Sequence, residues 1–115
     1  MVLFLIIGGW ISILDRIFIK KRKIQKYANI VSTANYIISC VKAEKMRPSK
    51  WNEFELDLVE KEMSEIINAI TDGKKIPSSK KRMLDSTYLL TDSIGLSSTD
   101  LGKNIQYFQK AIRKL

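Results

Sequence analysis

The chain of 115 residues contains no histidine and only one cysteine, Cys40. Without histidine it lacks the commonest general base and the commonest transition-metal ligand of proteins. A single cysteine can neither form an intramolecular disulfide nor build a thiolate metal site by itself. We therefore expect that the protein is not an enzyme, that it uses no cofactor or metal ion, and that it has no small-molecule substrate.

Residues that interrupt helices are also scarce, with two prolines and five glycines. Past Lys20 the chain shows no strand-like alternation, internal repeat or low-complexity tract, and its apolar residues recur at the helical period. The breaks fall at Pro48, at Asp72–Gly73 and at Gly95, because proline and glycine commonly end helices. The sequence therefore predicts an all-α fold.

The first 19 residues are almost uniformly apolar, with Asp15 and Arg16 as the only charged side chains, and Lys20–Lys26 then supplies five basic residues in seven. A helix of this length reaches roughly 28 Å, close to the ~30 Å hydrocarbon thickness of a bilayer. A basic flank marks the cytoplasmic side of such a helix. We therefore expect residues 1–23 to be a single-pass, transmembrane anchor with a basic stop segment, and residues 24–115 to form a cytoplasmic domain.

Two other interpretations of the apolar segment stay open. It could be a helix that is buried in a protein core or in an oligomer. It could also be a cleaved signal peptide, although its charges follow the apolar run instead of preceding it and no small-residue cleavage site is present.

The breaks divide the chain into four predicted helices. The first runs from about Leu3 to Met46 and carries a seam, meaning a row of apolar residues on one face, formed by Ile24, Tyr27, Val31, Ala34, Ile38 and Val41, with Ile30 and Ile37 beside it. The second begins near Asn52, which has capping-box spacing with Glu55. Its seam consists of Leu56, Val59, Met63, Ile66 and Ile70.

The third predicted helix covers Ser78 to Ile94, with Met83, Leu84, Thr87, Tyr88, Leu90 and Ile94 on its inner face. The fourth begins at a capping pair of Ser97 and Asp100, and its seam is Leu101, Ile105, Phe108, Ile112 and Leu115. Because the connections are short, successive helices should be antiparallel neighbours, and we expect residues 24–115 to form an up-down four-helix bundle.

In an up-down bundle, the second connection and the C-terminus lie at the end where the first helix leaves the membrane. Lys110, Arg113 and Lys114 would end there. The predicted contacts with membrane anionic lipid are Lys20, Lys21, Arg22, Lys23, Lys26, Lys74, Lys75, Lys80, Lys81 and Arg82. Each cation near an anionic leaflet contributes at most about 1 kcal/mol. The alternative is that these runs are ordinary solvated surface.

The second helix is acidic, with six carboxylates between Lys50 and Ile70. They either face the basic helices inside the bundle or leave an exposed stripe for a basic protein partner, formed by Glu55, Glu62 and Glu65. Trp51, close to Pro48, is either a contact in the capping region or an exposed anchor for a partner.

These features favour a small membrane-anchored protein that acts at the cytoplasmic face by binding an unidentified protein partner. Its size, basic charge and antiparallel four-helix plan over about residues 24–115 resemble the small immunity proteins that protect bacteriocin producers. The resemblance is one of architecture and implies an immunity or exclusion role, although the N-terminal span departs from the soluble pattern of that group.

Two other functions stay open. The protein could be a basic helical nucleic-acid-binding protein, in which the basic residues from Lys74 to Arg82 meet phosphates at a helix N-terminus. It could also be a structural subunit whose apolar helix packs into a larger complex.

Overall fold

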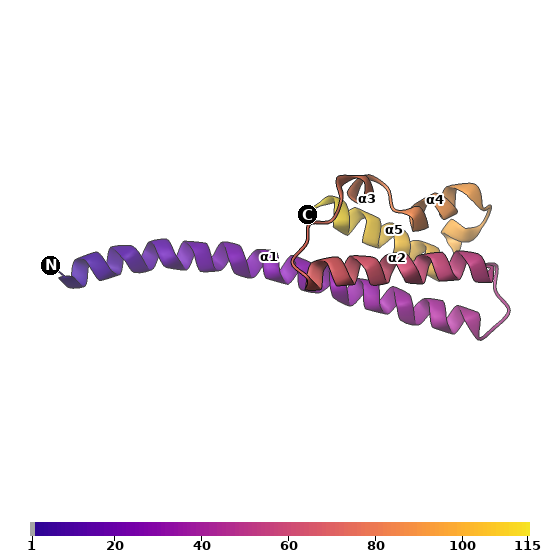
Figure 1. The fold of residues 1–115 in the computed structure, drawn as a ribbon, viewed down its shortest axis with the longest axis horizontal. Coiled ribbons are helices and arrows are strands. Elements are labelled where there is room, and N and C mark those ends of the chain that lie inside the picture. Colours follow the sequence, from indigo (N-terminus) through magenta and orange to yellow (C-terminus); the bar gives the residue numbers. More distant parts are fainter. Residues whose placement is uncertain (1) are drawn as a thin grey trace.

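The computed structural model describes the backbone of residues 2–115 and the side chains of residues 24–115. The predicted membrane anchor, with Lys20, Lys21, Arg22 and Lys23, therefore lies outside the residues described with side chains. The protein is an all-α helical bundle (Figure 1). Its elements are α1 (Val2–Lys45), α2 (Glu53–Thr71), α3 (Ser78–Arg82), α4 (Asp85–Asp92), a 3₁₀ turn η1 (Leu96–Ser98) and α5 (Asp100–Arg113).

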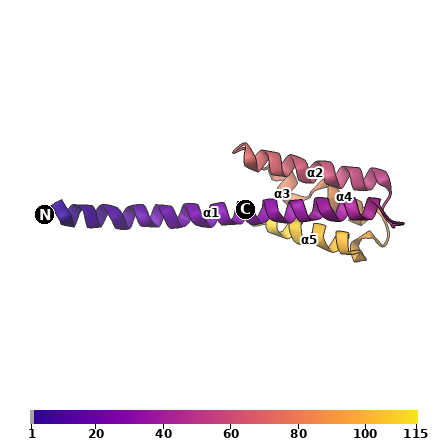
Figure 2. The same cartoon turned by 90° about the horizontal axis from the view of Figure 1, so that it is seen from below.

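From Ile24 onward, α1 packs against α2 and α5, and α2 also contacts α4. The chain runs along α1, returns along α2, advances again through α3 and α4, and returns along α5 (Figures 1 and 2). The C-terminus therefore lies at the same end of the bundle as Ile24 and the α2–α3 connection. Among the helices of the described part of the chain, none is both long and apolar enough to cross a membrane.

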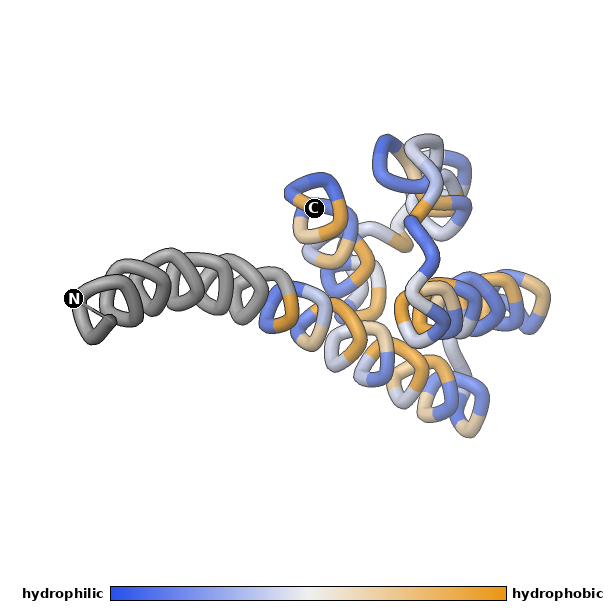
Figure 3. The backbone as a smooth tube through the Cα atoms, turned by 60° about the vertical axis from the view of Figure 1, so that its left-hand side comes forward, coloured by the Kyte–Doolittle hydropathy of each residue, from blue (hydrophilic) through white to orange (hydrophobic). Residues whose placement is uncertain are grey.

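One core joins the helices. Apolar and polar residues succeed one another along α2, α5 and the coloured part of α1 (Figure 3), as expected of amphipathic helices. The predicted faces of α2 and α5 are confirmed, since each of their central apolar residues is buried: Leu56, Val59, Met63, Ile66, Leu101, Ile105, Phe108 and Ile112. The Asn52–Glu55 capping box is also present at the start of α2.

The buried face of α1 is shifted from the centre of the predicted seam. Ala34 and Val41 of that seam are buried, as are Ile30 and Ile37, which were predicted beside it, whereas Ile24 is 66% exposed. Both rows have helical spacing, and the positions of α2 and α5 against α1 decide which one is covered. The first part of the predicted seam, including Tyr27 and Val31, consequently lines a surface groove.

The predicted third helix is broken. Met83 and Leu84 have extended backbone between α3 and α4, and Leu84 enters the core, where it is fully buried. Tyr88 and Ile94, expected on the inner face, are exposed. The break therefore replaces one long amphipathic helix with two short ones.

The start of α5 also differs from the predicted Ser97–Asp100 cap. The residue that caps α5 is Thr99, whose hydroxyl accepts the N–H of Gly102 at 3.0 Å. Gly102 itself is required there, because a Cβ atom at this position would lie 2.0 Å from the carbonyl oxygen of Leu96.

Candidate functional site

Basic residues from several elements gather at the end of the bundle where Ile24 lies. We call this surface the basic end and define it by eight cations: Lys26 of α1, Lys74 and Lys75 of the α2–α3 connection, Lys81 and Arg82 of α3, and Lys110, Arg113 and Lys114 at the end of α5. Because residues 1–23 join the bundle at Ile24, the basic run that starts at Lys20 is continuous in sequence with this surface.

Two features of the bundle bring the cations of α1, α3 and α5 close to one another. Lys26 of α1 lines a shallow cavity of about 310 Å³ together with Lys110 and Lys114 of α5. At the neighbouring corner, Arg113 donates from Nε and Nη2 to the carbonyl oxygen of Arg82, at 3.2 and 2.8 Å. This contact satisfies a carbonyl at the end of α3 and fixes the guanidinium of Arg113 beside Arg82.

The cations of the basic end are available to an anionic partner. All are exposed apart from Lys81, which is half-buried. Within residues 24–115, the cations that form ion pairs are Lys45, Arg47 and Lys80, none of which belongs to this surface. Like charges held together at one end create a positive potential that attracts anions.

Lys80 corrects the predicted set of lipid contacts. Its Nζ atom lies 2.7 Å from a carboxylate oxygen of Glu62 and 2.9 Å from one of Asp85. Burial alone would lower the pKa of Lys80, but the hydrogen bonds and charges of the two carboxylates outweigh it and raise that pKa. Lys80 therefore links α3 to Glu62 of α2 and to Asp85 of α4, and it is not a free surface cation.

Glu62 has a structural role. Its side chain is 3% exposed, and besides Lys80 it accepts the backbone N–H groups of Asp85 and Ser86, both at 2.8 Å. These are the first residues of α4, whose N-cap residue Leu84 has no side chain that could accept them. A carboxylate at a helix N-terminus is also favoured by the helix dipole. Glu62 thus caps α4 from a different helix.

Gln109 of α5, which is 3% exposed, hydrogen-bonds the backbone where the chain is broken between α3 and α4. Its Oε1 atom accepts the N–H of Leu84 at 2.7 Å, and its Nε2 donates to the carbonyl oxygen of Lys81 at 2.9 Å. Sequence analysis missed Gln109. A polar residue next to Phe108 in the apolar pattern of this helix was the available signal.

The acidic stripe and the exposed tryptophan predicted for a protein partner are not found. Glu55 is buried in the capping box and accepts the hydroxyl of Ser93 at 2.9 Å. Of the three predicted stripe residues, only Glu65 is exposed. Trp51 is 4% exposed and donates from Nε1 to the hydroxyl of Thr99 at 3.1 Å, which ties the α1–α2 connection to the start of α5.

A more exposed surface of mixed character lies on α2. Phe54 is 73% exposed. It lines a shallow cavity of about 380 Å³ with Leu58, Lys61 and four carboxylate residues, Asp57, Glu62, Glu65 and Asp85. This surface therefore combines an exposed aromatic side chain with several carboxylates.

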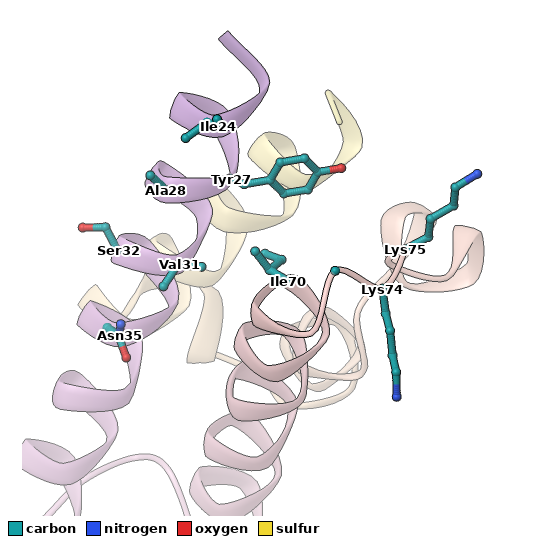
Figure 4. Close-up of a pocket in the computed structure, with 10 residues that line it drawn as sticks. Ile24, Tyr27, Ala28, Val31, Ser32, Asn35, Ile70, Lys74 and Lys75 are labelled. Atoms are coloured by element: carbon teal, nitrogen blue, oxygen red, sulfur yellow. The ribbon is translucent and has the colours of Figure 1, made fainter. Parts of the chain in front are cut away.

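A cavity of about 820 Å³ lies at the basic end, between α1 and the end of α2. We call it the α1–α2 groove. Figure 4 shows Tyr27 of α1 directed toward Ile70 of α2, with Lys74 and Lys75 extending in different directions from the following turn. The remaining lining residues are Ile24, Ala28, Val31, Ser32, Asn35 and Gly73.

In the part of the chain searched, no group of three or more cysteine or carboxylate side chains could hold a metal ion. Comparison of the chain with protein-family models, with curated proteins and with solved structures finds no match in any of the three. Assignment of a function therefore depends on the geometry and charge of the surfaces described above.

Proposed function

We propose that the protein is a single-pass membrane-anchored interaction protein, whose helical bundle docks by its basic end on an anionic cytoplasmic membrane surface. One observation carries this proposal: eight cations from four parts of the chain converge at the end where the apolar N-terminal segment joins the bundle. The apolar segment supplies the anchor, and the basic end orients the bundle against lipid phosphates.

In electrostatic docking of this kind each cation contributes little binding free energy, and the contributions of several cations add. A cation close to an anionic leaflet contributes at most about 1 kcal/mol, and its effect decays over a Debye length of about 8 Å at physiological salt. The interaction therefore needs several cations on one surface. A bundle held by its anchor and by this end would leave the face around Phe54 and Glu65 free for a basic protein partner.

Fractionation of the full-length protein tests this proposal. We expect the protein to stay with membranes through washes with high salt and with carbonate, since an inserted helix resists both. Recovery of the full chain as a soluble monomer without detergent would contradict the anchor. Release by salt alone would reduce the interaction to peripheral docking, and co-purification with nucleic acid would favour a nucleic-acid-binding protein instead.

A further inference from the structure

The α1–α2 groove is mainly apolar, with the polar residues Ser32 and Asn35 also in its lining, and it is basic at one end. Ile24, Tyr27, Ala28 and Val31 form a row on α1 at spacings of three and four residues, and Ile70 faces them from α2. Exposed apolar residues that gather in a hollow are a mark of a binding surface. No carboxylate is among the lining residues, so the charge of Lys74 and Lys75 is not balanced within the groove.

The size and the chemistry of the groove together indicate its occupant. A volume of about 820 Å³ falls within the range of roughly 300–1,000 Å³ that is typical of sites for small molecules. The ammonium groups of Lys74 and Lys75 extend in different directions (Figure 4), but both side chains are exposed and flexible enough to turn toward one anion. A mainly apolar channel with two lysines on the turn at its end matches a molecule with a hydrocarbon chain and a phosphate. Moreover, Ile24 of the groove directly follows the proposed anchor, residues 1–23, so the bilayer is the nearest source of such a molecule.

We propose that the α1–α2 groove binds one anionic phospholipid of the bilayer, with an acyl chain along Tyr27, Val31 and Ile70 and its phosphate at Lys74 and Lys75. This inference rests on the proposed function and deepens it, because it adds a defined lipid site to the general electrostatic attraction between the basic end and the membrane. The aromatic ring of Tyr27, 38% exposed, has the apolar body and polar tip that suit the boundary between acyl chains and headgroups.

The test uses the full-length protein in lipid nanodiscs, with Cys40 replaced by serine and a fluorescent bimane on a new cysteine. Ala28→Cys places the probe in the groove, whereas Gln25→Cys places it on the exposed surface of α1 outside the groove and one turn nearer to the proposed anchor. Lipids with brominated acyl chains quench a nearby probe. Co-elution of the protein with the nanodiscs reports on membrane association separately.

If the groove holds a lipid, brominated phosphatidylglycerol should quench the probe at position 28 more strongly than the probe at position 25. If depth in the bilayer alone determined the quenching, the probe at position 25 would be quenched more strongly. That result would contradict the lipid site without contradicting the membrane anchor. Failure of the protein to co-elute with nanodiscs would overturn both the lipid site and the proposed function.

Charge variants identify the headgroup. Replacing Lys74 and Lys75 together by glutamine should reduce the preference for phosphatidylglycerol over phosphatidylcholine by up to about 30-fold at low salt, the equivalent of about 1 kcal/mol for each lysine. The matched control replaces Lys42 and Lys103, two exposed lysines outside the groove, and should leave the preference unchanged. Equal losses in both variants would overturn the phosphate site. Displacement of the lipid by soluble glycerol phosphate would show that the site takes a phosphate without an acyl chain, and would overturn the lipid as its occupant.

Discussion

The carboxylate of Glu62 accepts the backbone N–H of Ser86 at 2.8 Å, across 24 residues of sequence. Through this bond, and the equivalent one to Asp85, a side chain of α2 determines where α4 begins. The same carboxylate holds Lys80. Removal of Glu62 would therefore leave two N–H groups and one half-buried ammonium without their partner.

Replacing Glu62 by alanine should lower the free energy of unfolding by about 3 kcal/mol or more, because loss of one member of a buried charged pair costs about 3–5 kcal/mol. Urea denaturation followed by circular dichroism measures this. The control is Glu65→Ala on the same helix, which removes an exposed carboxylate and should cost under about 0.5 kcal/mol. Similar losses in the two variants would show that Glu62 is not the cap of α4.

Replacing Gly102 by alanine should destabilise the protein although alanine is the better helix former. The new methyl group would meet the carbonyl of Leu96 at 2.0 Å, and overpacking of this kind costs about 1–3 kcal/mol. Lys103→Ala, at the exposed neighbouring position, serves as the control and should change stability by less than about 0.5 kcal/mol. A neutral or stabilising effect of Gly102→Ala would mean that η1 does not pack against the start of α5 as described.

Stability at alkaline pH should depend on Lys80. Its pKa is raised in the folded state by Glu62 and Asp85, so its ion pairs contribute fully below the ordinary lysine value of 10.5 and are lost as pH rises through the higher folded value. Lys80→Met should therefore flatten the decline of stability above that value. Lys81→Met serves as the control. If stability declined with pH in Lys80→Met as it does in the unchanged protein, the ion pairs of Lys80 would be contradicted.

A chain that begins at Lys20 should fold alone, since the core formed by the residues described with side chains, 24–115, extends from Ile30 to Ile112. It should bind anionic vesicles weakly and lose this binding in salt. Replacing Lys26, Lys110 and Lys114 by glutamine should weaken binding by about 2–3 kcal/mol at low salt. The control replaces three exposed lysines at the opposite end of the bundle, Lys42, Lys50 and Lys103.

The measurement is co-sedimentation with vesicles at several salt concentrations. Equal losses in the two triple variants would show that net charge and not position governs the interaction. Tighter binding of the truncated chain to duplex DNA than to vesicles, at matched salt, would favour the nucleic-acid alternative.

Sequence alone was sufficient for α2 and α5, where one apolar stripe per helix left a single choice of buried face. It was insufficient for α1, whose two overlapping stripes, one through Tyr27 and one through Ile30, both have helical spacing. Burial then depends on where neighbouring helices lie. The breaks of the chain were visible where proline or glycine caused them, and invisible at Met83–Leu84, where Glu62 and Gln109 supply the hydrogen bonds from distant positions.

Contacts between residues far apart in sequence also explain which features of the candidate site could be predicted. The grouping of basic residues at one end followed from counting helices, since alternating directions bring the α2–α3 connection and the C-terminus together. The roles of individual cations could not be predicted in the same way. Lys80 and Lys81 are neighbours in one basic run, and it is the fold that places the carboxylates of Glu62 and Asp85 beside Lys80.

The interruption between α3 and α4 has a consequence for dynamics. Helices of five and eight residues are well below the ~12–15 residues at which an isolated helix becomes marginally stable in water. Their persistence depends on side chains of α2 and α5, so we expect this stretch to open locally before the longer helices do. Each opening would detach Lys81 and Arg82 from the other six cations, and the charge presented by that end would fluctuate with the local unfolding equilibrium.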